Sequence, residues 1–193
     1  MESTLATEIE GAVAAALHAL SSDEKAGVYA LSFYISDDDE DPRHPTLMVG
    51  FNTEPQWKAS VAEASSADEA RWNFAFWLQN CIASFGERES ESAASVAQWI
   101  ASQGLAYSDA DEAANYDRCM DLGGRIVTQF AELSCAVARR LHDTSVVESV
   151  FGRSIPILVH ELEYYDEIAE QTASANPPGV AAAFVAWVHG GCE

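Results

Sequence analysis

The sequence predicts an α+β fold: a helix-rich single domain over residues 1–193, in which a small, mainly antiparallel sheet packs against helices. Two runs rich in aromatic and β-branched residues, Gly27–Ser36 and Thr46–Asn52, flank a proline-containing loop and predict a hairpin over residues 27–53. A compact apolar run over residues 155–160 predicts one more strand. Hydrophobic residues make up 48% of the 193, which is enough for a full core.

The stretch from Asp68 to Phe85 is expected to be the central helix of this domain. It holds two tryptophans and three phenylalanines, so it carries a large potential for burial. A helix this apolar must be covered on several sides, and we therefore expect Trp77 to be almost fully buried. The face that would be buried comprises Phe74, Trp77, Leu78, Cys81, Ile82 and Phe85.

The remaining helices follow from apolar residues at spacings of three and four. The most strongly amphipathic is the second half of residues 109–142, where Gly123 and Gly124 predict a kink or a join. The acidic run that begins at Glu161 is expected to open a helix directly after the strand. The predicted helical ranges are 4–20, 68–85, 87–103, 109–142, 145–151, 161–171 and 180–189.

The four cysteines are widely spaced and form no CxxC pair, which indicates reduced thiols in a cytoplasmic protein. They are Cys81, Cys119, Cys135 and Cys192, of which Cys81 and Cys135 are expected on buried helical faces. No cofactor and no metal site is predicted. The first ten residues lack the basic region of a signal peptide, and no apolar run approaches the roughly 20 residues that span a bilayer.

The charge is the most unusual bulk property of the chain. It has 31 acidic and 10 basic residues, a formal net charge of −21. Such a field repels nucleic acid and anionic membranes and attracts basic proteins. The sequence therefore predicts a basic protein partner, no nucleic acid and no membrane. The alternative is a compositional preference for acidic residues that serves solubility alone.

Five successive carboxylates form the loop of the predicted hairpin: Asp37, Asp38, Asp39, Glu40 and Asp41. They are the first candidate for binding a basic partner. A cation site is the second reading, although the spacing of a calcium-binding loop is absent. A solvated, self-repelling loop is the third.

The stretch from His160 to Glu167 has the densest set of chemically capable groups. A zinc protease motif would need a second histidine at position 164, where the chain has Tyr164. Glu163 and Glu167 would share a helical face, so they are candidates for partner binding or for a hard cation. His160 and Glu161 are weaker candidates for a ligand or metal contact. An acidic, solvated helix start is the alternative. No nucleophile motif of the GxSxG type occurs, and no catalytic residue is predicted.

Three segments resemble an uncharacterised bacterial domain family: Pro45–Thr53, Ala70–Trp77 and Ile155–Asp166. Proteins of this kind are similar to immunity and accessory proteins of polymorphic toxin systems. The matching motifs are structural, so the resemblance brings no catalytic residues with it. It implies a non-catalytic binding protein.

Two functions remain in view. The first is an acidic, non-catalytic binding protein, of the immunity type, that neutralises a basic partner through the loop and through Glu163 and Glu167. The second is a small-ligand sensor or an enzyme with a site near the His160 end of its strand. A flat or convex acidic face would favour the first function, and a deep pocket with converging polar groups would favour the second.

Overall fold

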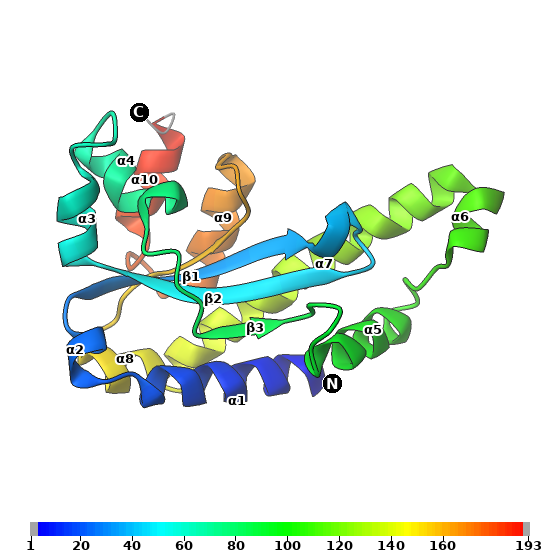
Figure 1. The fold of residues 1–193 in the computed structure, drawn as a ribbon, viewed down its shortest axis with the longest axis horizontal. Helices are drawn as coiled ribbons and strands as arrows, with labels where there is room; N and C mark the ends of the chain where they lie inside the picture. The colour runs from blue at the N-terminus through cyan, green and yellow to red at the C-terminus, as the bar shows by residue number, and fades with distance from the viewer. Residues whose placement is uncertain (1–3, 191–193) are drawn as a thin grey trace.

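The computed structural model describes residues 4–190, and it confirms the α+β class (Figure 1). Four strands form one sheet in the order β3-β2-β1-β4. As predicted, β1 and β2 are an antiparallel hairpin, but β4 pairs with β1 in parallel, so the sheet is mixed. The strands are β1 (Val28–Asp37), β2 (Pro45–Thr53), β3 (Ala83–Phe85) and β4 (Ile157–His160).

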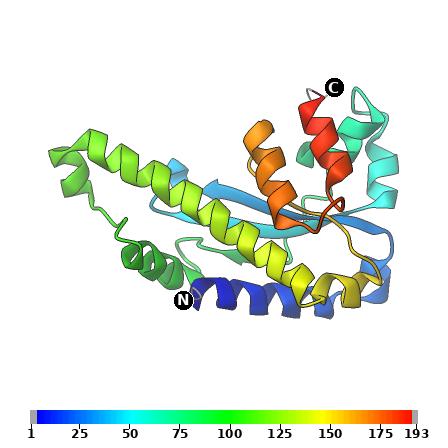
Figure 2. The same cartoon turned by 180° about the vertical axis from the view of Figure 1, so that it is seen from behind.

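The larger core lies between one face of the sheet and the helices α1, α5, α7 and α8. Alternate residues of β1 point into it, among them Leu31 and Phe33, both fully buried. The long helix α7 crosses this face of the sheet, with α1 beside it (Figure 2). The helices of this layer are α1 (Thr4–Ala19), α5 (Ser92–Ser102), α7 (Tyr116–Asp143) and α8 (Val146–Phe151).

A smaller, aromatic core covers part of the opposite face. The rings of Trp72 and Trp77 pack edge-on against Tyr29 of β1, at centroid distances of 5.9 and 5.8 Å. The helices on this side are α3 (Glu54–Ser60), α4 (Ala67–Trp72), α9 (Asp166–Ala175) and α10 (Ala182–His189). Short elements at the margins are α2 (Ser22–Lys25), η1 (Asp38–Glu40), η2 (Phe74–Phe76) and α6 (Asp109–Ala114).

The prediction of a central helix over residues 68–85 is wrong. Helix α4 ends at Trp72, where the side chain of Asn73 accepts a hydrogen bond from the Ala75 amide and starts the single turn η2. Gln79 then takes a left-handed backbone with φ 51°, and the chain continues to β3. The predicted burial of Trp77 is nevertheless confirmed at 4% exposure.

Of the cysteines, Cys119 and Cys135 are buried in α7, whereas Cys81 is exposed, contrary to expectation. Because the predicted helix over residues 68–85 does not form, the helical face on which Cys81 was expected to be buried does not exist. Cys192 lies outside the described residues.

The central helix is instead α7, with 28 residues. It does not kink at Gly123 and Gly124; the break between α6 and α7 falls at Asn115, whose side chain caps α7 through the Arg118 amide. Packing explains the glycine at position 123, because a Cβ there would lie 2.9 Å from the Pro42 ring. A Cβ on Gly124 would meet nothing within 4 Å.

Side chains in the last turn of α9 and at its C-cap replace a neighbouring strand at the outer edge of β4. The amide group of Asn176 accepts from the Ile157 N–H and donates to the Ile157 carbonyl, both at 2.8 Å. The Thr172 hydroxyl accepts from the Val159 N–H at 3.1 Å. Buried backbone groups at a sheet edge need such partners, so these contacts fix α9 along β4 and beside α7.

Candidate binding surface

The parallel pairing of β1 and β4 brings the two acidic stretches of the sequence to the same end of the sheet. Tyr34 is paired with His160, so the ends of both strands lie next to each other, with Asp37 ending β1 and Glu161 following β4. Partial burial raises the pKa of Asp37, and the carboxylate of Glu161 raises it further. Two segments more than 100 residues apart thus share one acidic surface.

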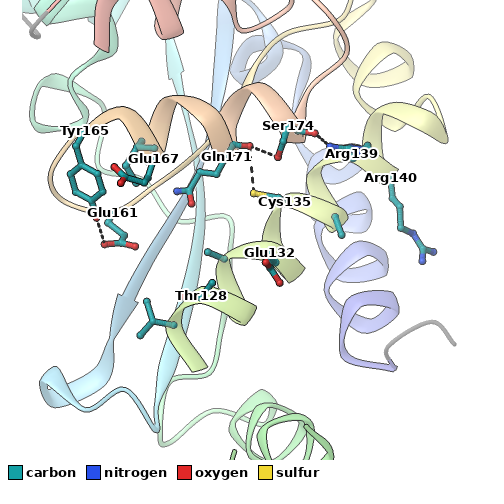
Figure 3. A pocket seen from close by; sticks show the side chains of 14 residues that line it. Thr128, Glu132, Cys135, Arg139, Arg140, Glu161, Tyr165, Glu167, Gln171 and Ser174 are labelled. Carbon is teal, nitrogen blue, oxygen red and sulfur yellow. Dashed lines mark hydrogen bonds between the residues drawn. The ribbon is translucent and has the colours of Figure 1, made fainter. Parts of the chain in front are cut away.

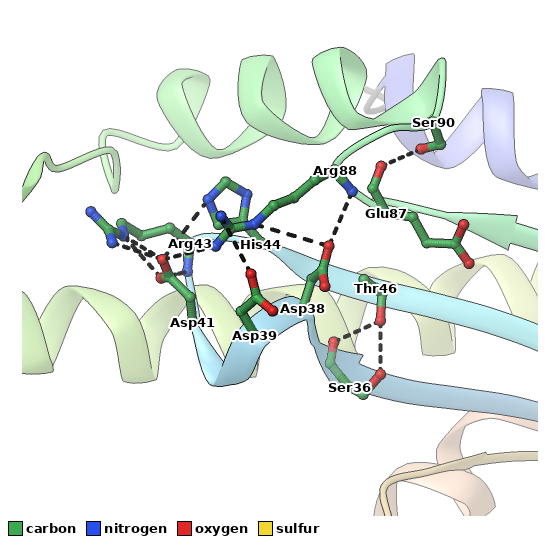
Figure 4. A network of polar contacts seen from close by, with 10 residues as sticks. All are labelled: Ser36, Asp38, Asp39, Asp41, Arg43, His44, Thr46, Glu87, Arg88 and Ser90. Carbon is green, nitrogen blue, oxygen red and sulfur yellow. Dashed lines mark hydrogen bonds and ion pairs between the residues drawn. The ribbon is translucent and has the colours of Figure 1, made fainter.

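Two arginines compensate part of the charge of the acidic loop, residues 37–41 (Figure 4). Arg43 forms a two-pronged pair with Asp41, at 2.9 Å from Nε to Oδ1 and 2.7 Å from Nη2 to Oδ2, and this contact lowers the pKa of Asp41. Arg88 lies 3.6 Å from a carboxylate oxygen of Asp39 and 4.0 Å from one of Asp38. The loop therefore presents less free negative charge than its sequence suggests.

Glu161, Glu163 and Glu167 are arranged differently from the expectation. Residues 161–165 form a connection, and α9 begins only at Asp166, so Glu163 and Glu167 do not share a helical face. That prediction is wrong because β4 extends to His160, and the chain must turn before α9 can pack along it. Within residues 4–190, none of the three glutamates has an ion-pair partner. Their charge is available to a partner.

His160 is enclosed in the aromatic core. Its side chain is fully buried, with Nδ1 2.9 Å from the Glu161 carbonyl and Nε2 2.8 Å from the Ser32 hydroxyl. Burial lowers the pKa of His160 to about 4, so the ring is neutral at pH 7: Nδ1 donates to the carbonyl and Nε2 accepts from Ser32. The rings of Phe74 and Tyr164 lie 5.1 and 5.6 Å away. Both ring nitrogens are thus already used inside the fold.

A groove of about 800 Å³ lies between α7 and α9, next to the acidic end of the sheet (Figure 3). The two helices run in the same direction, as the contact of the Cys135 thiol with the Gln171 carbonyl at 3.5 Å and that of Arg139 with the Ser174 carbonyl show. Burial raises the pKa of Cys135 to about 11, so this thiol is protonated and unreactive. The apolar lining comprises Val127, Ala131, Cys135, Ala136 and Ile168.

The two ends of the groove differ in charge. Glu161 and Glu167 lie at one end together with the exposed Tyr165, whose hydroxyl donates to Glu161 at 3.3 Å. Arg139 and Arg140 lie at the other end. The sequence analysis did not predict this groove, because it depends on α9 packing beside α7. The apolar spacing of Val127, Ala131 and Cys135 on α7 was the only local signal.

Comparisons of the chain with protein-family models, with curated proteins and with solved structures gave no match. The resemblance to immunity proteins therefore stays a prediction. Among residues 4–190, no helix is long and apolar enough to cross a membrane. In the same part of the chain, no three His, Cys, Asp or Glu side chains are grouped as a metal site would require.

Proposed function

We propose that this chain is a non-catalytic binding protein that takes up a basic protein partner, as an immunity-type factor does. The observation that carries the proposal is the convergence of Asp37, Glu161, Glu163 and Glu167 at one end of the sheet, where the three glutamates have no ion-pair partner among the described residues. Uncompensated carboxylates attract a basic surface over distance and speed its association.

The surroundings of these carboxylates support a contact surface. The exposed side chains Leu162 and Tyr165 lie between them, at 75% and 43% exposure, and supply apolar and aromatic contact area. His160, the group best suited to acid–base chemistry in this region, is enclosed and hydrogen-bonded. Binding by complementary charge needs no catalytic group, so the carboxylates together with Leu162 and Tyr165 can provide it.

The test uses the proteins encoded by the genes on either side of this one, purified and measured for association at several salt concentrations. We expect one of them to be basic and to bind. Replacing Glu161, Glu163 and Glu167 by glutamine should slow its association by about tenfold at low salt and flatten the salt dependence.

The matched control replaces three exposed glutamates far from this surface, Glu8, Glu63 and Glu148, by glutamine. It removes the same charge and should change the association rate little. Equal effects from the two triple variants would contradict the proposal and leave the acidity as a general property of the surface.

A further inference from the structure

We propose that the groove between α7 and α9 takes up an amphipathic helix of the partner, with the basic residues of that helix at the Glu161 end. This inference rests on the proposed function and specifies the form of the ligand. Four features of the groove carry it: its length, its small lining residues, its charge asymmetry and its continuation along α7.

The length and lining of the groove suit a helix. Along α7 it extends from Val127 to Arg139, twelve residue steps or about 18 Å, which corresponds to about three turns of a bound helix. Ala131, Cys135 and Ala136 are small side chains, so a third helix axis can approach α7 and α9 at the 8–10 Å typical of packed helices. An amphipathic helix would cover the apolar lining with its own apolar face.

The charges at the two ends determine the orientation. Glu161 and Glu167 lie at one end without ion-pair partners in the described residues, and Glu132 borders the middle. At the far end, Arg139 already donates to the Ser174 carbonyl and Arg140 is paired with Glu10. Lysine or arginine side chains of a partner therefore gain attraction at the Glu161 end and meet like charge at the arginine end.

The surface of α7 continues beyond the groove toward its first residue. A shallower hollow borders the groove and shares Thr128 and Glu132 with it, and it includes Gly124, beside which a Cβ would have free space. Further along the same side of α7 are Met120 and Tyr116, at 55% and 60% exposure. A partner helix longer than three turns would therefore find further apolar contacts on α7.

The test uses a synthetic 14-residue peptide of leucine and lysine whose leucines share one helical face and whose lysines are concentrated at one end. We expect it to bind, and to shift the backbone amide signals of Val127, Ala131 and Ile168 in nitrogen-15 NMR spectra. A nitroxide on its lysine-rich end should broaden the signals of Glu161 and Glu167 more strongly than that of Arg139. Absence of binding, or stronger broadening at Arg139 than at Glu161 and Glu167, would overturn the inference.

A substitution in the groove distinguishes apolar contact of the peptide with the groove from attraction by charge alone. Ala136 is exposed and lines the groove, so Ala136→Glu adds an attractive charge but places a carboxylate under the leucine face of the peptide, where its burial is costly. We expect at least a tenfold rise in Kd for Ala136→Glu and no rise for Ala101→Glu, the same change at an exposed position of α5. An unchanged or lower Kd for Ala136→Glu would overturn the groove site.

Two further comparisons keep the inference and the proposed function apart. A peptide of the same composition without an amphipathic face should bind at least tenfold more weakly. If it binds equally well, and Glu161→Gln with Glu167→Gln weakens both peptides, the helix inference fails and the acidic binding surface stands. If the two glutamine substitutions have no effect on either peptide, the proposed function fails as well.

Discussion

Replacing Asn176 by leucine should strongly destabilise this protein, because Asn176 completes the edge of the sheet. Its side chain is 7% exposed and pairs with both backbone groups of Ile157 at 2.8 Å and with the Thr172 carbonyl at 2.8 Å. Leucine has a similar shape, so the variant removes the hydrogen bonds and leaves little cavity. Each buried backbone group left without a partner costs about 1–3 kcal/mol, and two groups of Ile157 give a loss of about 2–6 kcal/mol.

The measurement is the urea unfolding midpoint, with hydrogen exchange of individual amides as a local readout. Ser174→Ala is the matched control on the same helix, since the Ser174 hydroxyl is exposed and donates to the Gln171 carbonyl one turn back. It should change the free energy of unfolding by less than about 0.5 kcal/mol. In Asn176→Leu, the Ile157 amide should also exchange faster. Equal midpoints for the two variants would refute the idea that α9 side chains replace a strand.

Three further predictions concern stability and are measured by urea unfolding. Gly124→Ala should stabilise the fold by about 0.5–1 kcal/mol through helix propensity. Gly123→Ala should be less stable than Gly124→Ala by about 1–3 kcal/mol, because its Cβ would lie 2.9 Å from the Pro42 ring. Equal free energies of unfolding for the two variants would contradict the packing argument. Trp77→Ala should cost about 3–5 kcal/mol, and an unchanged midpoint would refute the burial of this ring at 4% exposure. Burial lowers the pKa of His160 to about 4, so the unfolded chain, with an ordinary histidine pKa, binds the proton more readily between pH 6.5 and 4. His160 should therefore reduce stability by up to about 3 kcal/mol as the pH falls through this window, and a His160→Gln variant with the same pH slope as the parent would contradict this.

The hairpin was predictable because its signal is local. Residues of β1 alternate between the two cores, and the aromatic and β-branched content of both strands is high. The periodicity and the composition therefore both indicate strands. The acidic loop between them was found for the same reason. What the loop sequence does not reveal is that Arg88, far away in the chain, lies against its carboxylates.

The false central helix shows the limit of composition. A stretch apolar on all sides is compatible with a helix and equally with an irregular segment whose rings point into a core. Asn73 decides between them, because its side chain binds the Ala75 amide and ends α4. Similarly, His160 is satisfied by Ser32, a partner 128 residues away that no local pattern indicates. The groove depends on the contacts of Asn176 with β4, which are equally long in range.

The position of the arginines decides which of the many acids are available to a partner. The chain has 31 acidic and only 10 basic residues, so most acids cannot be paired within the fold. Arg43 and Arg88 both serve the acidic loop, and within residues 4–190 no arginine pairs with Glu161 or Glu167. A preference for acidic residues that served solubility alone would make unpaired acids interchangeable. Binding through this surface makes Glu161 and Glu167 different from Glu8, which is exposed to solvent on α1. The association rates of the two triple glutamine variants therefore distinguish a functional charge from a compositional one.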